Sequence, residues 1–241
     1  MLNNSFVLVT CVYNSEKWID RCIESCNIQG DDVGHIIVDD CSTDSTYEKI
    51  KKHKRKDRLI LRTRKRLRTP GYTQQKVIKS HVGNPESIIG VIDGDDYLFD
   101  DAVEVVRKNI GDNWMFCSNR MNGKIEQDRY KIRCSTPVNW DIPIRDQPFM
   151  WHHFRGFKKH LSDRVNPKDF FNKNNRLMGA GSDIPYMYAM LEMAGEERSI
   201  YIYDTLYYHN IYNPLNDHKV YYLEQYNAKF HVKDIDAYDK I

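Results

Sequence analysis

The sequence predicts an α/β protein with a mostly parallel sheet and helices on both of its faces. Short, largely apolar runs at residues 6–12, 35–39 and 88–92 are typical of strands that are covered on both sides. Stretches with helical spacing of apolar residues lie between these runs, and such strand–helix alternation builds parallel sheets. With 241 residues, 41% of them hydrophobic, the chain is long enough to bury a core without disulfides or a structural metal.

The first half is expected to contain five strands, at residues 6–12, 35–39, 59–61, 88–92 and 114–117. Four helices are expected between them, at residues 16–28, 42–50, 71–81 and 100–110. Asn14 and Ser15 can cap the first of these helices, and Ser42 and Thr43 can cap the second. Each of the first four strands is thus followed by a helix, as a parallel sheet requires.

The second half differs from the first, because aromatic clusters and turn residues interrupt its pattern. It predicts one clear helix at residues 183–194, two short strands at residues 200–203 and 206–208, and a last amphipathic helix at residues 219–230. No Pro/Gly/Ser-rich linker separates the halves. We therefore expect one fused domain, in which residues 121–241 build the wall of a site on residues 1–120.

Several classes of protein are excluded. No apolar run approaches the ~18 residues of a membrane helix, and the run at residues 6–13 lacks the basic segment and cleavage site of a signal peptide. The six cysteines show no paired CxxC spacing, which favours reduced thiols in a cytoplasmic protein.

Polar and acidic residues follow three of the predicted strands. The first strand leads into Cys11 and Tyr13, the second ends in Asp39 and Asp40, and the fourth ends in the acidic segment Asp-Gly-Asp-Asp at residues 93–96. Ligands of open α/β sheets bind beyond these carboxyl ends. Neighbouring carboxylates repel one another unless a cation lies between them, and Mg²⁺ or Mn²⁺ prefers one or two carboxylates plus phosphate oxygens. The acidic segment therefore predicts a metal–phosphate site, whereas Asp39 and Asp40 are equally well explained as a helix cap.

Three segments resemble family 2 glycosyltransferases with the GT-A fold. They are VTCVYNSEKW at residues 9–18, VDDCSTDST at residues 38–46 and VIDGDDYL at residues 91–98. With the helix–strand order between them, they cover about the first 120 residues. The resemblance implies a nucleotide-sugar donor, usually a UDP-sugar, whose diphosphate is bridged by Mn²⁺ or Mg²⁺ to the acidic DxD motif. Residues 1–120 would bind this donor, and residues 121–241 would bind the acceptor.

The same resemblance implies roles for individual residues. Cys11 and Tyr13 would line the nucleobase pocket, and either Asp39 or Asp40 would hydrogen-bond the base. Asp93 would face the ribose or the metal, beside Asp95.

Asp95 would be the principal metal ligand, and Gly94 would let the backbone approach the bulky donor closely. Lys76 would contact the diphosphate, although the family's usual Arg-Asn pair is replaced by Gln-Gln-Lys-Val at residues 74–77. Arg68 is a further candidate for the diphosphate.

Transfer with inversion of the sugar also needs a carboxylate that takes the proton of the acceptor hydroxyl. The family places this base at the start of a helix after the sheet, and Asp183 matches it here. Its alternative role is that of an acid interacting with the helix dipole. The segment WHHFRGF at residues 151–157 lies where the family has acceptor- or sugar-facing residues, and His209 could approach the metal.

The net charge of +2 hides an uneven distribution. Residues 51–68 contain eleven Lys and Arg and one acid, so this basic run carries +10 and leaves −8 for the rest of the chain. A solvated face with diphosphate contacts from Arg66 or Arg68 is the simplest interpretation; anionic lipid and nucleic acid are the others. Because +10 exceeds what one diphosphate needs, we expect a polyanionic partner, with DNA slightly favoured over a membrane-associated glycan.

The favoured acceptor is accordingly a hydroxylated base in DNA, as in a phage-type DNA-modifying enzyme. A first alternative is transfer to a cell-surface polysaccharide or a lipid-linked glycan. A second is a nucleic-acid-binding protein on a degenerate transferase scaffold, against which the retained Asp93, Asp95 and Asp183 argue. A nucleotidyltransferase would need a Gly-rich loop after the first strand, and residues 11–15 contain no glycine.

Overall fold

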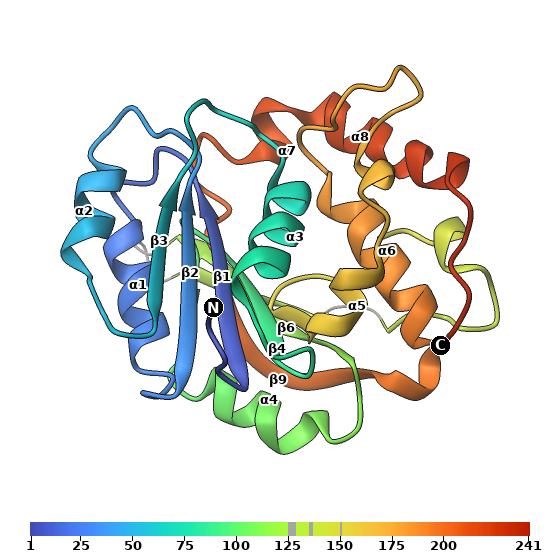
Figure 1. Cartoon of the computed structure of the whole chain (residues 1–241), viewed down its shortest axis with the longest axis horizontal. Coiled ribbons are helices and arrows are strands. Elements are labelled where there is room, and N and C mark those ends of the chain that lie inside the picture. Colours follow the sequence, from blue (N-terminus) through green and yellow to red (C-terminus); the bar gives the residue numbers. More distant parts are fainter. Residues whose placement is uncertain (125–128, 135–136, 150) are drawn as a thin grey trace.

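The computed structural model describes residues 1–124, 129–134, 137–149 and 151–241. Within them, a nine-stranded sheet runs through both halves of the chain in the order β3-β2-β1-β4-β8-β6-β9-β5, and β7 pairs with β6 (Figure 1). The strands are β1 (Phe6–Val12), β2 (Val33–Asp39), β3 (Arg58–Arg62), β4 (Ile88–Asp93), β5 (Tyr97–Leu98), β6 (Met115–Lys124), β7 (Arg129–Arg133), β8 (Arg155–Lys158) and β9 (Ser199–His209). The α-helices are α1 (Ile19–Asn27), α2 (Thr46–Lys52), α3 (Pro70–His81), α4 (Ala102–Ile110), α5 (Lys159–Arg164), α6 (Asp183–Ala194), α7 (Asp217–Val220) and α8 (Tyr222–His231).

Strands β3, β2, β1 and β4 form the parallel block that the apolar runs predict. Its register aligns the polar ends of three strands, because Val12 pairs with Asp39 and Cys11 pairs with Asp93. Almost all residues of β1 and β2 are buried from solvent. The segments expected to bind a ligand therefore meet at one edge of the sheet.

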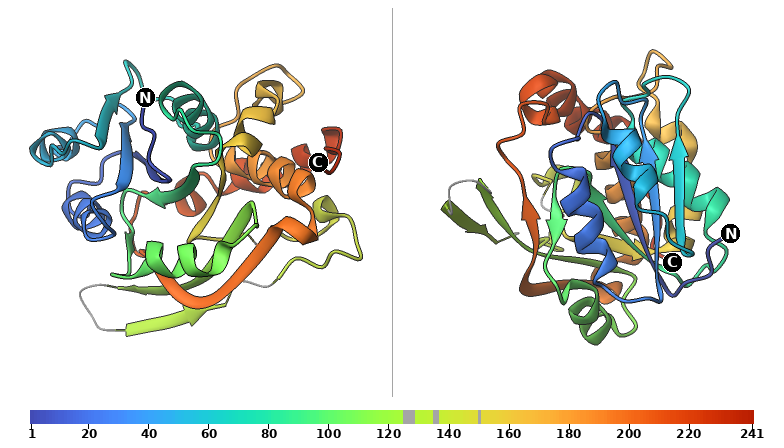
Figure 2. Two further views of the ribbon diagram at one scale, coloured as in Figure 1. Left: turned by 60° about the horizontal axis from the view of Figure 1, so that its bottom comes forward. Right: turned by 90° about the vertical axis from the view of Figure 1, so that its left-hand side faces the viewer.

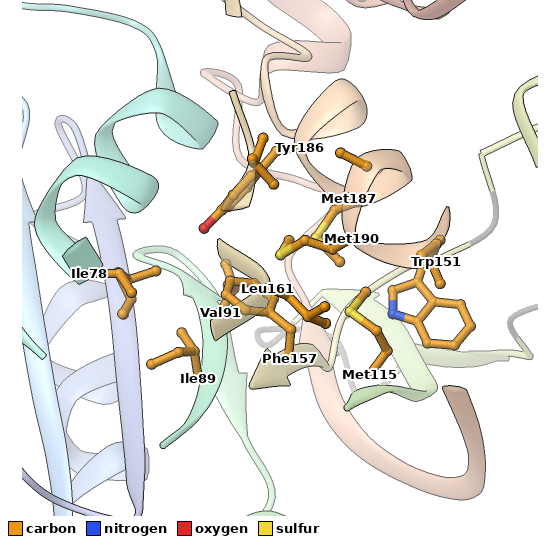
Figure 3. Packing of buried hydrophobic residues seen from close by; sticks show 14 of the residues in the cluster. Ile78, Ile89, Val91, Met115, Trp151, Phe157, Leu161, Tyr186, Met187 and Met190 are labelled. Carbon is orange, nitrogen blue, oxygen red and sulfur yellow. The ribbon is translucent and has the colours of Figure 1, made fainter. Parts of the chain in front are cut away.

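Helices cover both faces of the sheet, as predicted (Figures 1 and 2). On one face, α1, α2 and α4 bury side chains that include Ile23, Ile50 and Val106. On the other face, α3, α5 and α6 pack against the sheet (Figure 3). The helices contribute Ile78, Leu161, Tyr186 and Met190, and the strands contribute Ile89, Val91, Met115 and Phe157. The predicted α/β fold class is confirmed in this arrangement.

The second half departs from the prediction in several places. The two short strands expected at residues 200–203 and 206–208 are one strand, β9, which pairs in parallel with β6 and shifts register beside Asn119. Strands β7 and β8 and helix α5 were not expected, and β8 lies antiparallel between β4 and β6. The last helix is broken at Tyr221 into α7 and α8.

The predicted helix caps are wrong. Neither α1 nor α2 has a side-chain cap hydrogen bond, and the helices begin later than expected, at Ile19 and Thr46. Ser42 Oγ instead accepts a hydrogen bond from the backbone N–H of Asn14 at 2.9 Å, and Asn14 Oδ1 accepts one from the backbone N–H of Thr43 at 2.8 Å. These polar residues therefore tie the loop after β1 to the loop after β2.

Candidate active site

A cavity of about 580 Å³ opens at the carboxyl edge of the parallel strands. Eight of the ten residues predicted for the site line it: Cys11, Tyr13, Asp40, Arg68, Asp93, Gly94, Asp95 and Asp183. They come from segments far apart in the chain, from Cys11 to Asp183, and the sheet topology brings them together.

The other two predicted residues, Asp39 and Lys76, do not line this cavity. The Asp39 side chain has no solvent exposure, and its Oδ2 lies 3.0 Å from Arg62 Nε. Burial raises the pKa of Asp39, and hydrogen bonds from Ser42 oppose the rise. Lys76 is exposed on α3, where its ammonium lies 5.7 Å from the centre of the Tyr72 ring.

Asp40 shapes the wall of the cavity by holding the loop that follows β3. Its carboxylate accepts hydrogen bonds from the backbone N–H groups of Leu67 and Arg68, each at 2.8 Å, and from Thr63 Oγ1 at 3.0 Å. This loop places the Arg66 guanidinium 3.6 Å from the centre of the Tyr13 ring. An aromatic ring and a guanidinium at the open end of a sheet form a surface on which a planar base can stack.

The acidic segment after β4 forms a tight turn, in which the backbone N–H of Asp96 donates to the carbonyl of Asp93 at 3.1 Å. Gly94 is required here, because a Cβ at this position would lie 2.4 Å from Val12 Cγ2. Asp96 is buried and accepts hydrogen bonds from the Tyr207 hydroxyl and the Asn210 backbone N–H, both at 2.7 Å. It therefore anchors the end of β9 and leaves Asp93 and Asp95 for the cavity.

Asp93 and Asp95 carry unfavourable charge in the absence of a cation. Burial, followed by the charge of Asp95, raises the pKa of Asp93 to about 7, and burial also raises the pKa of Asp95. Asn213 Nδ2 donates a hydrogen bond to Asp95 Oδ2 at 2.7 Å. A divalent cation would remove this electrostatic cost, so the two carboxylates fit a metal site.

Among the described residues, no group of three or more His, Cys, Asp or Glu is close enough to hold a metal by itself. Mg²⁺ uses one or two protein carboxylates and takes its other ligands from substrate phosphates and water. His209 lines the same cavity, and burial lowers its pKa to about 3, so the ring is neutral. Its buried Nδ1 has no hydrogen-bond partner among the described residues.

Asp183 lies at the first position of α6 and lines the same cavity. Its Oδ2 accepts a hydrogen bond from Arg155 Nη2 at 2.5 Å, and Arg155 is itself buried in β8. Within the described chain, no group donates a hydrogen bond to Asp183 Oδ1. The carboxylate is therefore oriented through one oxygen and open at the other.

The start of α6 is positioned by close contact with α3. The backbone N–H of Gly71 donates to Ser182 Oγ at 3.1 Å. A Cβ on Gly71 would lie 2.4 Å from the Ser182 carbonyl oxygen and 2.7 Å from the Asp183 nitrogen. Only glycine allows this approach, so Gly71 helps to set the position of Asp183.

The segment at residues 151–157 contributes three side chains to the cavity, His152, His153 and Arg155. Burial is the main cause that lowers the pKa of His152 to about 3 and holds the pKa of His153 well below its usual value. Both rings are therefore neutral, and the 3.7 Å approach of His153 Nε2 to Asp93 Oδ2 is not an ion pair.

The cavity also has lining residues that were not predicted, and Asn213 and Asp217 are two that interact with its carboxylates. Burial, followed by the charge of Asp183, raises the pKa of Asp217 to about 6. Both residues lie between β9 and α8, in a segment with no strand or motif that would have pointed to them.

The basic run does not form one strip. Strand β3 divides it, so that residues 51–58 and residues 62–68 lie at opposite ends of this strand. At the cavity end, Arg62 pairs with Asp39, and Arg68 donates two hydrogen bonds to Glu224 at 2.8 and 2.9 Å. Arg62 and Arg68 of the basic run are therefore paired with acids of the same protein.

The fold is shared with solved glycosyltransferase structures. The chain superposes on Staphylococcus aureus TarS residues 1–349 in complex with UDP with a TM-score of 0.68 and 17% identity, over 94% of this chain and 64% of that one. It superposes on the mannosyltransferase PcManGT from Pyrobaculum calidifontis, in complex with GDP-Man and Mn²⁺, with a TM-score of 0.63 and 12% identity, over 98% and 66% of the two chains. The predicted GT-A fold is confirmed by these likenesses.

The model of glycosyl transferase family 2 matches residues 7–165, and the chain belongs to this family. Over 156 residues it is 31% identical to a chondroitin synthase of Escherichia coli, a match that covers 60% of this chain and 21% of that protein. Over 167 residues it is 29% identical to a hyaluronan synthase of Pasteurella multocida, covering 65% and 16%. The matches thus span about a fifth of the length of these relatives.

Proposed function

We propose that this protein transfers a sugar from a nucleotide-sugar to an acceptor hydroxyl, with inversion at the anomeric carbon and with a divalent metal. The observation that carries the proposal is the single cavity that joins a base-stacking surface, two carboxylates suited to a metal and an oriented third carboxylate. Membership of family 2 supports the same activity.

The donor would lie along the carboxyl edge of the sheet. Tyr13 and Arg66 offer a stacking surface for its base, and Asp40 lies at the same end of the cavity. The solved relatives in complex with UDP and with GDP-Man support a nucleotide-sugar donor, and we favour a UDP-sugar.

Asp93 and Asp95 would hold Mn²⁺ or Mg²⁺. When bound, the metal neutralises charge on the diphosphate and so makes it a better leaving group. The Mn²⁺ in the mannosyltransferase complex supports this assignment.

The reaction would be a direct displacement. The acceptor oxygen forms a bond to the anomeric carbon while the bond between this carbon and the diphosphate oxygen breaks, and the electron pair leaves with the nucleoside diphosphate. Asp183 would take the hydroxyl proton on Oδ1, while Arg155 holds Oδ2 by a hydrogen bond.

We propose a glycan as the acceptor, because the similar chains include a chondroitin synthase and a hyaluronan synthase. A hydroxylated base in DNA is the second candidate, which rests on the basic run. It has less support than the charge of +10 suggests, since β3 divides the run and Arg62 and Arg68 form internal ion pairs.

The test is a screen of nucleotide-sugars for stabilisation of the protein in the presence of Mn²⁺, because a ligand of the folded state raises Tm. The stabilising donor is then incubated with glycan oligosaccharides and, separately, with hydroxymethylated duplex DNA. We expect transfer to a glycan, and its loss in Asp183→Asn. Failure of every nucleotide-sugar to raise Tm or release its diphosphate would refute the proposed activity.

A further inference from the structure

The segment between β9 and the C-terminus carries an exposed apolar surface. Thirteen large hydrophobic side chains of the described chain are exposed, and seven of them lie between residues 212 and 230. We name these seven the α7–α8 patch: Tyr212, Leu215, Val220, Tyr222, Leu223, Tyr226 and Phe230. Scattered exposed hydrophobics are normal, but such a concentration marks an interaction surface.

Four members of the patch lie on α8, on one side of the helix. Tyr222, Tyr226 and Phe230 recur every four residues, so they lie on one side of the helix. Their rings contact one another, with centroids 6.1 Å apart in the first pair and 5.0 Å apart in the second. Leu223 lies beside them with 71% of its surface exposed.

The opposite side of α8 is already occupied by the body of the protein. Ala228 is buried where Gly181 approaches it, since a Cβ on Gly181 would lie 2.8 Å from the Ala228 Cβ. Glu224 forms the ion pair with Arg68 at 2.8 Å. The helix is thus fixed by one face, and its exposed hydrophobic side chains lie on the other.

Cationic side chains border the patch. Lys219 and Lys229 are exposed on α7 and α8. The loop that carries exposed Arg64 and Lys65 adjoins the start of α8, because Arg68 of the same loop lies 3.7 Å from the centre of the Tyr221 ring. A helix with aromatic and leucine residues on one face and flanking lysines and arginines is typical of proteins that lie in the interface of an anionic bilayer.

We propose that the α7–α8 patch docks the protein on the surface of a membrane that contains anionic phospholipids. The aliphatic and aromatic side chains enter the headgroup region, while Arg64, Lys65 and the helix lysines meet lipid phosphates. The part of the chain that the structure describes contains no helix with the length and apolar character of a membrane span. Leu215 and Lys229 also line the active-site cavity, so docking places the mouth of this cavity beside the membrane.

Other occupants fit the patch less well. A nucleic-acid backbone binds the cations but offers no apolar partner to Leu215, Val220 and Leu223. In a symmetric dimer the same patch would face itself and would bring Lys219 and Lys229 close to their own copies. Anionic lipid matches both the apolar face and its basic border.

The test is flotation of the full chain with two kinds of vesicle, phosphatidylcholine alone and phosphatidylcholine mixed equally with phosphatidylglycerol. We expect binding to the mixed vesicles, about tenfold weaker for Leu223→Glu. Ile28→Glu is the matched control, because Ile28 is 56% exposed at the end of α1, and it should bind as the wild type does. Phe230→Glu repeats the test at a second position of the patch.

A double variant, Arg64→Gln with Lys65→Gln, tests the basic border and should reduce the preference for mixed over neutral vesicles about tenfold. The proposal is overturned if the wild type binds neither vesicle, or if Leu223→Glu binds as tightly as Ile28→Glu. It is also overturned if light scattering shows a wild-type dimer that Leu223→Glu dissociates, or if duplex DNA alone is retained by the basic border. Because vesicle binding needs no donor sugar, failure here leaves the proposed transfer reaction untouched.

Discussion

Replacement of Gly71 by Ala tests whether the contact between α3 and α6 positions the base. The added Cβ would lie 2.4 Å from the Ser182 carbonyl oxygen and 2.7 Å from the Asp183 nitrogen, both main-chain atoms that no rotamer change can move away. Ordinary van der Waals contact begins near 3.4 Å, so the start of α6 must shift by about 1 Å. The perturbation therefore acts on Asp183 through its backbone.

The expected cost has two parts. Overpacking of this kind lowers the free energy of unfolding by about 1–3 kcal/mol, which denaturant titration measures. A displacement of about 1 Å at a reacting group lowers turnover by up to about a hundredfold, which release of the nucleoside diphosphate measures. The KM for the donor should change little, since Tyr13 and Asp40 lie on other elements.

Gly34→Ala is the matched control. A Cβ at Gly34 would meet the end of the Asn4 side chain at 3.0 Å, and this side chain can move aside far from the cavity. It should retain turnover close to that of the wild type. A folded Gly71→Ala protein with unchanged turnover would refute the positioning argument.

Three further outcomes are expected. Asp183→Asn should lower nucleoside diphosphate release about 10²–10⁴-fold with unchanged donor binding, and retained turnover would exclude Asp183 as the base. Glu224→Gln should change the free energy of unfolding by no more than about 1 kcal/mol, since the ion pair of Glu224 with Arg68 is partly exposed. The same variant should speed hydrogen exchange in α8, and unchanged exchange would contradict the anchoring of this helix. Burial holds the pKa of His35 well below its usual value of 6.5. Below pH 6.5, His35 is therefore protonated in the unfolded chain while it stays neutral in the folded chain. The free energy of unfolding should therefore fall on acidification below about pH 6.5, by up to about 1.4 kcal/mol per pH unit for this histidine. In denaturant titrations at several pH values, His35→Gln should show a shallower fall. An equal slope would show that His35 does not contribute.

The parallel block could be predicted because its signal is local. Each of the strands β1, β2 and β4 is a largely apolar run, and burial on both faces requires such runs. The acidic segment after β4 was equally visible, since a cluster of carboxylates at a strand end has few structural explanations. Residues 93–95 accordingly line the cavity.

What the sequence concealed depends on contacts between distant segments. Strand β8 has the sequence RGFK, with two cations in four residues, and becomes a strand because β4 and β6 provide hydrogen-bonding partners on both sides. Its Gly156 permits this fit, since a Cβ there would lie 2.1 Å from the Ile89 carbonyl oxygen. The sequence could not distinguish Asp39 from Asp40 for the same reason. Arg62 of β3 pairs with Asp39, whereas Asp40 lines the cavity.

The basic run shows how an average over sequence can mislead about a surface. Eleven cations in eighteen residues indicate one strip. Strand β3 lies in the middle of this run, however, and carries the chain from one end of the sheet to the other. The cations near the cavity divide between internal pairing, as in Arg62 and Arg68, and exposure, as in Arg64 and Lys65. Only the exposed group is available to a partner.

The central claim is that the cavity binds a nucleoside diphosphate together with a metal held by Asp95. Calorimetric titration of UDP in the presence and absence of Mn²⁺ tests it directly, with the wild type and Asp95→Asn side by side. The account predicts that Mn²⁺ tightens UDP binding to the wild type, and that Asp95→Asn loses this gain by about tenfold or more. Equal UDP affinity with and without Mn²⁺ in the wild type, or an undiminished effect of Mn²⁺ in Asp95→Asn, would contradict it.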